Sequence, residues 1–227
     1  HDPQSAARKI ANSLSGNIYC MDKEHQVYRV IHSGADSSTQ IIDFMLARSP
    51  NIEHDLQMRD FTINAMAVNL QDPQKIIDPL LGAQNLSQKI LKGCTSSTFI
   101  DDPIRILRGI RIAAEGEYQI EKQTRDWMKK SVTLLGDASV ERRRDELIKI
   151  IVSPKPEKAI RALLWLSALN YLIPEFDVLV NNHGIGWLEK YLSGLVCSNS
   201  LLNLLFQNDP EQSASDIVQG IAINELR

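Results

Sequence analysis

The sequence predicts an α+β fold in which a small sheet comes first in the chain and helices follow. Polar, turn-forming segments separate three β-rich runs, as in a meander of strands: NIYCM (17–21), QVYRVI (26–31) and QIIDFML (40–46). After Phe99 the strand patterns stop and amphipathic patterns of helical period dominate. We therefore expect a sheet domain over residues 1–100, a helical part over 101–175 and a helical C-terminal region over 176–227.

Each element has its own local signal. Ala6, Ile10 and Leu14 recur at helical spacing, so a helix is expected over residues 3–14, ending at Ser15-Gly16. FTINAMAVNL (61–70) is compatible with helix or strand, and KIID (75–78) is expected to form a short strand. Prolines separate the later helices, which are expected over residues 103–115, 121–135, 139–152, 156–170, 185–206 and 213–226.

Composition limits the classes of function. The chain has 227 residues, 43% of them hydrophobic, which is ordinary for a soluble globular protein. Its net charge of −3 gives no general attraction to nucleic acid or to an acidic membrane, so a phosphate-binding surface must be local. The three cysteines lie outside any C-x-x-C spacing, which favours a reducing cytosol over a disulfide framework or a zinc site. With no membrane-length apolar run and no apolar leader, a cytoplasmic location and no membrane partner are expected.

The segment IDDPIRILRGIR places an arginine at every third position of an expected helix. Asp102 and Pro103 are typical of a helix start. Arg105, Arg108 and Arg111 share an arc of about 120°, from the 3.6-residue period, and the apolar positions Ile106, Leu107, Ile110 and Ala113 lie opposite them. The arginines are therefore expected to face a groove, where guanidinium groups suit phosphate oxygens and base edges, although a solvated helix face is the alternative.

A second polar cluster lies in MRDFTINAMA (58–67). Arg59, Asp60 and Asn64 stand among small and apolar residues, and polar groups in such an element must find hydrogen-bond partners in the protein or in a ligand. An ion pair between Arg59 and Asp60 that serves the structure alone is the other interpretation.

Four segments in order, MRDFTINAMA, IIDPLLGAQNL, FIDDPIRILRGIRIAAE and VERRRDELIKII, resemble the class II tRNA nucleotidyltransferases (CCA-adding enzymes) and bacterial poly(A) polymerases, over residues 3–175. The resemblance implies a partial nucleotidyltransferase head with a mixed sheet, related to DNA polymerase beta, followed by an all-helical neck and body. It also implies a transferase in tRNA processing that adds C and/or A to the tRNA 3′ end from CTP and ATP, with protein side chains reading the base.

The resemblance also assigns roles to residues. Asp60 would select the ribose 2′-hydroxyl, with Arg59 and Asn64 supporting the nucleotide. Asp101, Asp102 and Arg105 correspond to the family's E-D-x-x-R motif, in which an acceptor, Asp102, and a donor, Arg105, imitate the edge of a complementary base.

Further roles are implied by position. Arg108 and Arg111 would lie toward the triphosphate, whereas Glu141, Arg142 and Arg144 are expected to serve the structure. Asp101 stands where the family commonly has glutamate, and Met58 where it has arginine, so both leave the nucleotide preference open.

The family's G-G-x-x-R-D loop and D-x-D carboxylate pair are absent from this sequence. Mg²⁺ is the expected cofactor, bound mainly by that missing pair, because two-metal catalysis needs carboxylates that hold both ions. Asp43 is expected to be a third carboxylate, catalytic and metal-binding, or else only a strand-edge residue. Without the pair the chain is expected to be inactive, and to be either a fragment or one part of an enzyme whose missing motifs lie on another chain or segment.

The sequence leaves alternatives open. A poly(A) polymerase of the same family, or a noncatalytic RNA-binding or scaffold protein with the same fold, would share these motifs. Lys129-Lys130 and Arg142-Arg143-Arg144 are candidate RNA contacts or solvated helix faces, and Trp187 and Tyr191 are expected in the core.

Overall fold

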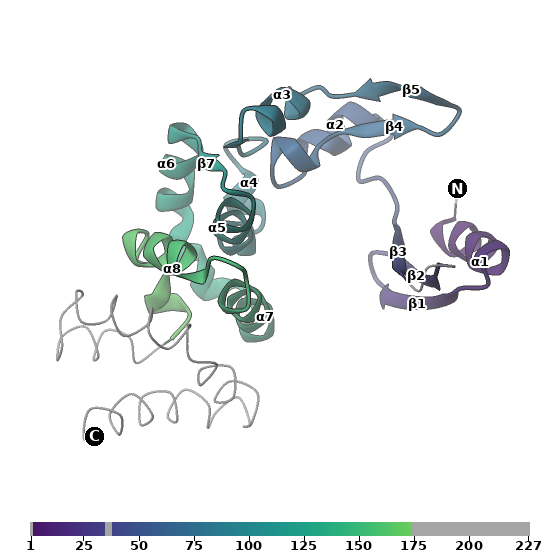
Figure 1. Ribbon diagram of the computed structural model, residues 1–227. Coiled ribbons are helices and arrows are strands. Elements are labelled where there is room, and N and C mark those ends of the chain that lie inside the picture. The colour runs from purple at the N-terminus through teal and green to yellow at the C-terminus, as the bar shows by residue number, and fades with distance from the viewer. Residues whose placement is uncertain (1, 35–37, 174–227) are drawn as a thin grey trace. The chain divides into compact units, whose positions relative to one another are not determined.

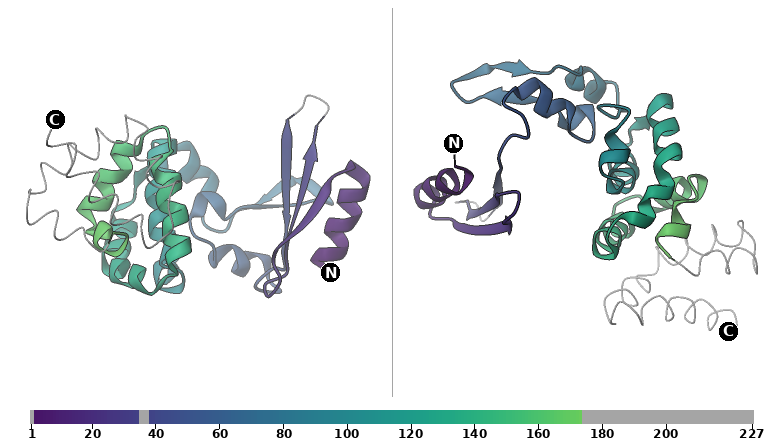
Figure 2. Two further views of the ribbon diagram at one scale, coloured as in Figure 1. Left: turned by 90° about the horizontal axis from the view of Figure 1, so that it is seen from below. Right: turned by 180° about the vertical axis from the view of Figure 1, so that it is seen from behind.

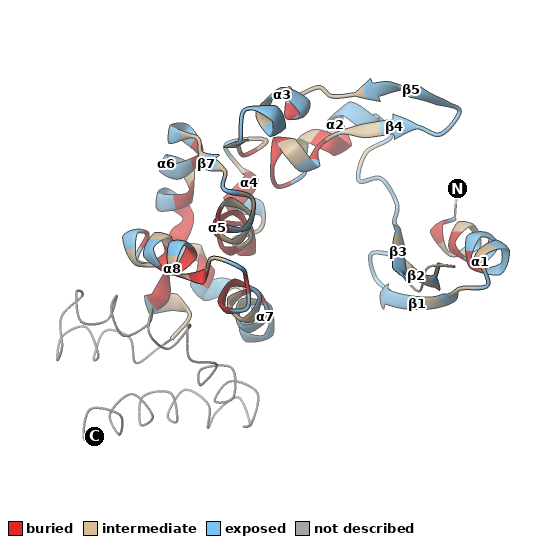
Figure 3. Ribbon diagram, viewed as in Figure 1, coloured by how far each residue is buried: buried red, intermediate tan, exposed pale blue. Residues whose placement is uncertain are grey.

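The computed structural model describes residues 2–34 and 38–173 and divides into two compact units, with the boundary between Asp55 and Leu56. Each unit has its own hydrophobic core (Figures 1 and 3).

The first unit is a three-stranded antiparallel sheet with one helix, as the sequence predicts (Figure 2). Its elements follow in chain order: α1 (Pro3–Leu14), β1 (Asn17–Asp22), β2 (Val27–Ser33) and β3 (Thr39–Phe44). The carboxylate of Asp2 caps α1 by accepting the N–H groups of Gln4 at 3.0 Å and Ser5 at 3.1 Å. Ala7 and Ala11 of α1 are buried with Val30, so the helix covers one face of the sheet.

The second unit begins with short elements. They are α2 (Ile52–Gln57), which crosses the boundary between the units, a 3₁₀ turn (Thr62–Asn64), β4 (Ala67–Asn69), β5 (Asp72–Ile77), α3 (Gly82–Ser87) and β6 (Ile90–Leu91). The segment 61–70 is thus a 3₁₀ turn followed by a strand, which is why neither period fitted it. Residues 75–77 of the predicted strand 75–78 belong to β5, which starts earlier, ends before Asp78 and pairs antiparallel with β4.

Helices make up most of the second unit after β6. They are α4 (Thr98–Asp101), α5 (Ile104–Gly116), α6 (Lys122–Ser131), α7 (Val140–Ile151) and α8 (Pro156–Trp165), with 3₁₀ segments at Val132–Asp137 and Ala168–Tyr171 and the short strand β7 (Gln119–Ile120) parallel to β6. The predicted helices up to residue 170 are confirmed, although two of them end in 3₁₀ turns. Those predicted over 185–206 and 213–226 lie outside the described residues. No helix in the described part of the chain is long and apolar enough to span a membrane.

The core of the second unit joins residues from both sides of position 100. Phe61, Leu91 and Phe99 belong to the same buried cluster as Leu107 and Leu163. The segment after Leu56 buries its apolar side chains against the helices. One hydrophobic core therefore continues across residue 100, where the sequence changes from strand patterns to helix patterns. The division into domains over 1–100, 101–175 and 176–227 stays a prediction.

Candidate functional site

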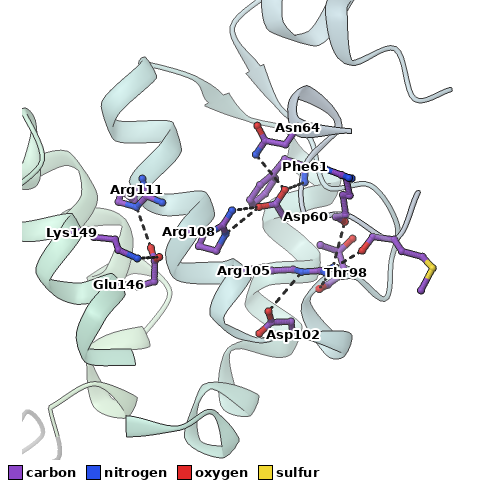
Figure 4. Close-up of polar contacts among 12 residues, drawn as sticks. Asp60, Phe61, Asn64, Thr98, Asp102, Arg105, Arg108, Arg111, Glu146 and Lys149 are labelled. Carbon is purple, nitrogen blue, oxygen red and sulfur yellow. Dashed lines mark hydrogen bonds and ion pairs between the residues drawn. The ribbon is translucent and has the colours of Figure 1, made fainter. Parts of the chain in front are cut away.

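The segment around Asp60 packs directly on α5 (Figure 4). A Cβ on Gly109 would lie 2.5 Å from Cζ of Phe61, so the absence of a side chain at this position lets the Phe61 ring approach the helix. The ring also contacts Phe99, with centroids 6.1 Å apart. The segment 58–67 and α5 thus lie in contact and form one candidate site, although Asp60 and Arg108 are almost fifty residues apart in sequence. The sequence pointed to each of the two segments separately.

Asp60 is buried, and its carboxylate is fully hydrogen-bonded. Oδ1 accepts from the N–H of Phe61 at 2.8 Å and from Nδ2 of Asn64 at 3.3 Å. Oδ2 accepts from Nε and Nη2 of Arg108 at 3.1 and 2.8 Å. Burial favours the neutral acid, but the hydrogen bonds and charge of Arg108 outweigh it and hold the pKa of Asp60 below its ordinary value. The partner of Asp60 is therefore Arg108, whereas the sequence suggested the adjacent Arg59, whose side chain is exposed.

Arg105 does not lie on an open face as the helical period predicted. Its exposed fraction is 7%, and its guanidinium donates to three backbone carbonyls: Nη2 to Met58 at 3.0 Å, and Nη1 to Thr98 and Arg59 at 3.3 and 3.4 Å. The reason is tertiary, because the segment 58–60 folds over the start of α5 and covers this position. Arg105 thus links that segment to α5 through hydrogen bonds to its backbone.

Asp102 is the more exposed member of the predicted base-reading pair. Its Oδ1 accepts the N–H of Ile104 at 3.3 Å, although α5 begins at Ile104 with Pro103, not Asp102, as its N-cap residue. Its Oδ2 lies 2.8 Å from Nη2 of Arg142 on α7 and 4.0 Å from Nε of Arg105. Asp101 is exposed on α4, where its carboxylate accepts from the hydroxyl of Ser97 at 2.8 Å.

Arg111 faces a third acidic partner, which sequence analysis did not identify. Its Nε donates to Glu146 of α7 at 3.1 Å, and its Nη1 also contacts Glu115. Glu146 is buried, and burial favours its neutral form, but Lys149 at 2.8 Å together with Arg111 lowers the pKa of the carboxyl below its ordinary value. The spacing of Glu146 four residues before the buried Ile150 is the signal that could have placed it on the inner face of α7.

Cys94 lies beside this site, and its N–H donates to the carbonyl of Asp60 at 3.2 Å. Burial, with the nearby Asp60 carboxylate, raises the pKa of its thiol to about 12. The thiol therefore stays protonated at neutral pH, which excludes a thiolate nucleophile at this position.

Asp43 belongs to the first unit and stands on the opposite face of the sheet from α1. Directly across from it on β2, Arg29 donates to both of its oxygens, at 2.7 and 2.8 Å, and these hydrogen bonds lower the pKa of Asp43. Among residues 2–34 and 38–173 no group of three His, Cys, Asp or Glu side chains could hold a metal ion. One carboxylate already paired with arginine does not fit a two-metal centre, so the described residues alone cannot provide it.

Comparison with known proteins agrees with the motifs. The model of the family described as "Poly A polymerase head domain" matches residues 6–92, and the one described as "Probable RNA and SrmB- binding site of polymerase A" matches residues 117–179. The chain belongs to the class II tRNA nucleotidyltransferase and poly(A) polymerase family. The segment between the two matches contains the whole of α4 and α5.

Relatives in this family carry several related names. A CC-adding tRNA nucleotidyltransferase of Geobacter sulfurreducens is 35% identical over 147 residues, covering 65% of this chain and 33% of the relative. An A-adding tRNA nucleotidyltransferase of Deinococcus radiodurans is 30% identical over 179 residues, covering 77% and 39%. The chain thus spans between a third and two fifths of the length of these relatives.

Solved structures share the fold. A CCA-adding enzyme in complex with CTP matches with a TM-score of 0.70 and 26% identity, covering 98% of this chain and 56% of that one. A tRNA nucleotidyltransferase complexed with a primer tRNA and an incoming ATP analog matches with a TM-score of 0.65 and 26% identity, covering 76% and 52%. The fold is therefore the α+β nucleotidyltransferase fold that the motifs implied.

Proposed function

We propose that the chain is the nucleotide-reading part of a template-independent tRNA nucleotidyltransferase, which adds C and/or A to the tRNA 3′ end from CTP and ATP. The observation that carries this proposal is the contact of its two nucleotide motifs. Arg108 of the arginine helix pairs with Asp60 of the RDFTINA segment, and Arg105 fastens the backbone of that segment. The names of the relatives, CC-adding, A-adding and CCA-adding, support the same reaction class.

Arg108 is proposed to exchange partners when a nucleotide binds. A carboxylate offers about four acceptor sites, and in Asp60 they are taken by Phe61, Asn64 and two bonds from Arg108. A ribose hydroxyl can reach Asp60 only if one of these donors moves away. The side chain of Arg108 is 40% exposed, so it is the donor free to turn toward the phosphates and leave Oδ2 to the ribose.

Base reading is proposed to depend chiefly on Asp102. Its carboxylate can accept from the exocyclic amino group of cytosine or adenine, a group that uracil and guanine lack at the equivalent position. Arg105 uses three of its five N–H groups on backbone carbonyls, so its Nε–H, near Asp102, is the donor proposed to complete the pattern.

Transfer itself requires groups beyond the described residues. Enzymes of this family generally use divalent metal ions, and we propose Mg²⁺, held by the D-x-D pair that this sequence lacks. No step of the reaction is assigned to Asp43, which the structure pairs with Arg29. We place the reaction in the cytoplasm, as the composition predicts.

Calorimetry of the 227-residue chain with CTP, ATP, UTP and GTP tests nucleotide reading. CTP or ATP is expected to bind more tightly than UTP and GTP, and Asp102→Asn should remove that preference because the amide presents a donor as well as an acceptor. Asp126→Asn, at an exposed position of α6 outside both motifs, is the matched control and should change little. Equal affinity for all four nucleotides would reject the base-reading role.

Primer extension then tests the reaction. The chain, supplemented with a segment that carries the G-G-x-x-R-D and D-x-D motifs, is expected to add one to three nucleotides to tRNA that lacks its 3′ end. Long A tracts would instead show the poly(A) polymerase activity that the head-domain description names. The rival hypothesis, a noncatalytic RNA-binding or scaffold protein with the same fold, predicts no CTP or ATP binding by the unmutated chain.

A further inference from the structure

The carboxylate of Asp102 is held from two sides. Its Oδ1 accepts the N–H of Ile104 at 3.3 Å, and its Oδ2 accepts from Nη2 of Arg142 on α7 at 2.8 Å. Asp102 and Arg105 lie beside each other (Figure 4), but Nε of Arg105 is 4.0 Å from the same Oδ2, which is beyond hydrogen-bond distance. The position of Oδ2 is therefore set by Arg142 and not by Arg105.

The place of Arg142 in its own helix gives no reason for an arginine. Ser139 is the N-cap residue of α7 and accepts the N–H of Arg142 at 3.3 Å, so Arg142 is the third residue of the helix. The helix dipole disfavours a positive charge in the first turn, and glutamate or glutamine at this position would complete a capping box with Ser139. The contribution of Arg142 must therefore be sought in its contact with Asp102.

The face of α7 that meets α5 carries a charge pattern complementary to it. Arg142 and Glu146 are four residues apart, so they share one side of α7. Arg142 pairs with Asp102 before the start of α5, and Glu146 pairs at 3.1 Å with Arg111 in the later half of α5. The buried Glu146 pair fixes α7 along α5, so Arg142 reaches Asp102 from a defined direction.

The two members of the proposed base-reading pair differ in how they are held. The side chain of Arg105 is 8% exposed and donates to three backbone carbonyls, so packing fixes the donor. The side chain of Asp102 is 25% exposed, and its Oδ2 is oriented by Arg142. A carboxylate oxygen has two acceptor sites, so Oδ2 keeps one for the amino group of a base.

We propose that Arg142 is a positioning residue for base selection, which holds Oδ2 of Asp102 beside Nε of Arg105 so that this acceptor and this donor face a base together. Cytosine and adenine match the pattern with an amino group next to an accepting ring nitrogen, whereas uracil and guanine present a carbonyl oxygen and a ring N–H there. The inference rests on the proposed function, in which Asp102 reads the base. It assigns a task in nucleotide selection to a residue that the sequence left as structural or as an RNA contact.

Calorimetry of the 227-residue chain with CTP and UTP tests the proposal through the ratio of the two affinities. Arg142→Ala should lower the preference for CTP by about 2- to 12-fold, the range of one hydrogen bond. Arg142→Lys should keep part of the preference, because an ammonium can still donate one bond to Oδ2. Arg144→Ala is the matched control and should leave the ratio unchanged, because Arg144 is exposed and, two residues on, lies on a different side of α7.

Coupling between the two residues gives a second test. In the Asp102→Asn background, Arg142→Ala should not change the ratio further, because no carboxylate remains to be oriented. Urea unfolding of Arg142→Ala should give a midpoint close to that of the unmutated chain, since a largely exposed ion pair contributes little to stability. A lower midpoint or a weaker affinity for single-stranded RNA, with the CTP to UTP ratio intact, would overturn the proposal in favour of a structural or RNA-contacting role.

The failure of this inference can be told from that of the proposed function. A CTP preference that Asp102→Asn removes and folded Arg142→Ala retains would overturn the role of Arg142 and leave the proposed function. Equal affinity of the unmutated chain for CTP and UTP would reject base reading itself, and the role of Arg142 with it.

Discussion

Replacing Gly109 with alanine tests whether the site depends on the close approach of the Asp60 segment to α5. The new Cβ would lie 2.5 Å from Cζ and 3.2 Å from Cε1 of Phe61, and 3.1 Å from Cε of Met128. Carbon atoms in contact normally stay about 3.5–4.0 Å apart, so the ring would have to move by about 1 Å. Phe61 has no exposed surface and rests on Phe99, so the ring cannot move without disturbing its neighbours.

The expected cost depends on two opposing effects. Overpacking of a core costs about 1–3 kcal/mol, and alanine in a helix interior is favoured over glycine by about 0.8–1.0 kcal/mol. The clash involves a buried ring, so we expect Gly109→Ala to lower the free energy of unfolding by about 1–2 kcal/mol.

Urea unfolding followed by tryptophan fluorescence measures this change. Gly136→Ala is the matched control, because its nearest contact would be an ordinary 3.7 Å from Tyr171, and it should leave stability unchanged or slightly raised. In the double variant with Phe61→Leu the cost of Gly109→Ala should shrink, since the ring atom is gone. If the Gly109→Ala protein is as stable as the Gly136→Ala control, then Phe61 does not pack closely on α5 at Gly109, and the reasoning is wrong.

Three further predictions concern titratable groups. Because the folded-state pKa values of Asp60 and Glu146 lie below their ordinary values of 3.8 and 4.5, the stability they provide is present above those values and is lost as pH falls through the lowered ones. Stability measured from pH 7 down to pH 3 should therefore fall less steeply in Asp60→Asn than in the unmutated chain; parallel curves would contradict the ion pair with Arg108. Glu146→Ala should destabilise by about 3–5 kcal/mol, as expected for breaking a buried ion pair, and more than Glu115→Ala, whose partner is the same Arg111 but whose carboxylate is exposed. Cys94 should react with a thiol reagent at pH 8 far more slowly than the exposed Cys20, and equal rates would contradict its raised pKa.

The local chemistry of the chain predicted much of the fold. The β meander, the helix at its start and the helices from residue 103 to residue 170 could be predicted from apolar period, prolines and caps, all of which act between near neighbours. The buried face of α5 was predicted in the same way, since Ile106, Leu107 and Ile110 are indeed in the core. The structure of the ambiguous segment 61–70 could not be predicted, because a single 3₁₀ turn leaves no period to detect.

Hydrogen-bond and ion-pair partners that are distant in sequence could not be predicted from helix period or capping. The helical period of α5 placed Arg105, Arg108 and Arg111 on one face, but it could not show that the segment 58–60 and α7 cover that face. Arg105 is buried because residues 58 and 59 fold over it and accept hydrogen bonds from its guanidinium through their carbonyls. Arg111 donates to Glu146 because α7 packs beside α5.

The sequence by itself determined which residue types are available for reading a nucleotide and that they lie in two short motifs. Only the tertiary structure decided which acid pairs with which arginine, and that the only carboxylate predicted to bind metal, Asp43, is paired with Arg29. The physical reason is range: helix period and capping involve groups a few residues apart, whereas ion pairs and burial depend on the packing of segments that are distant in sequence.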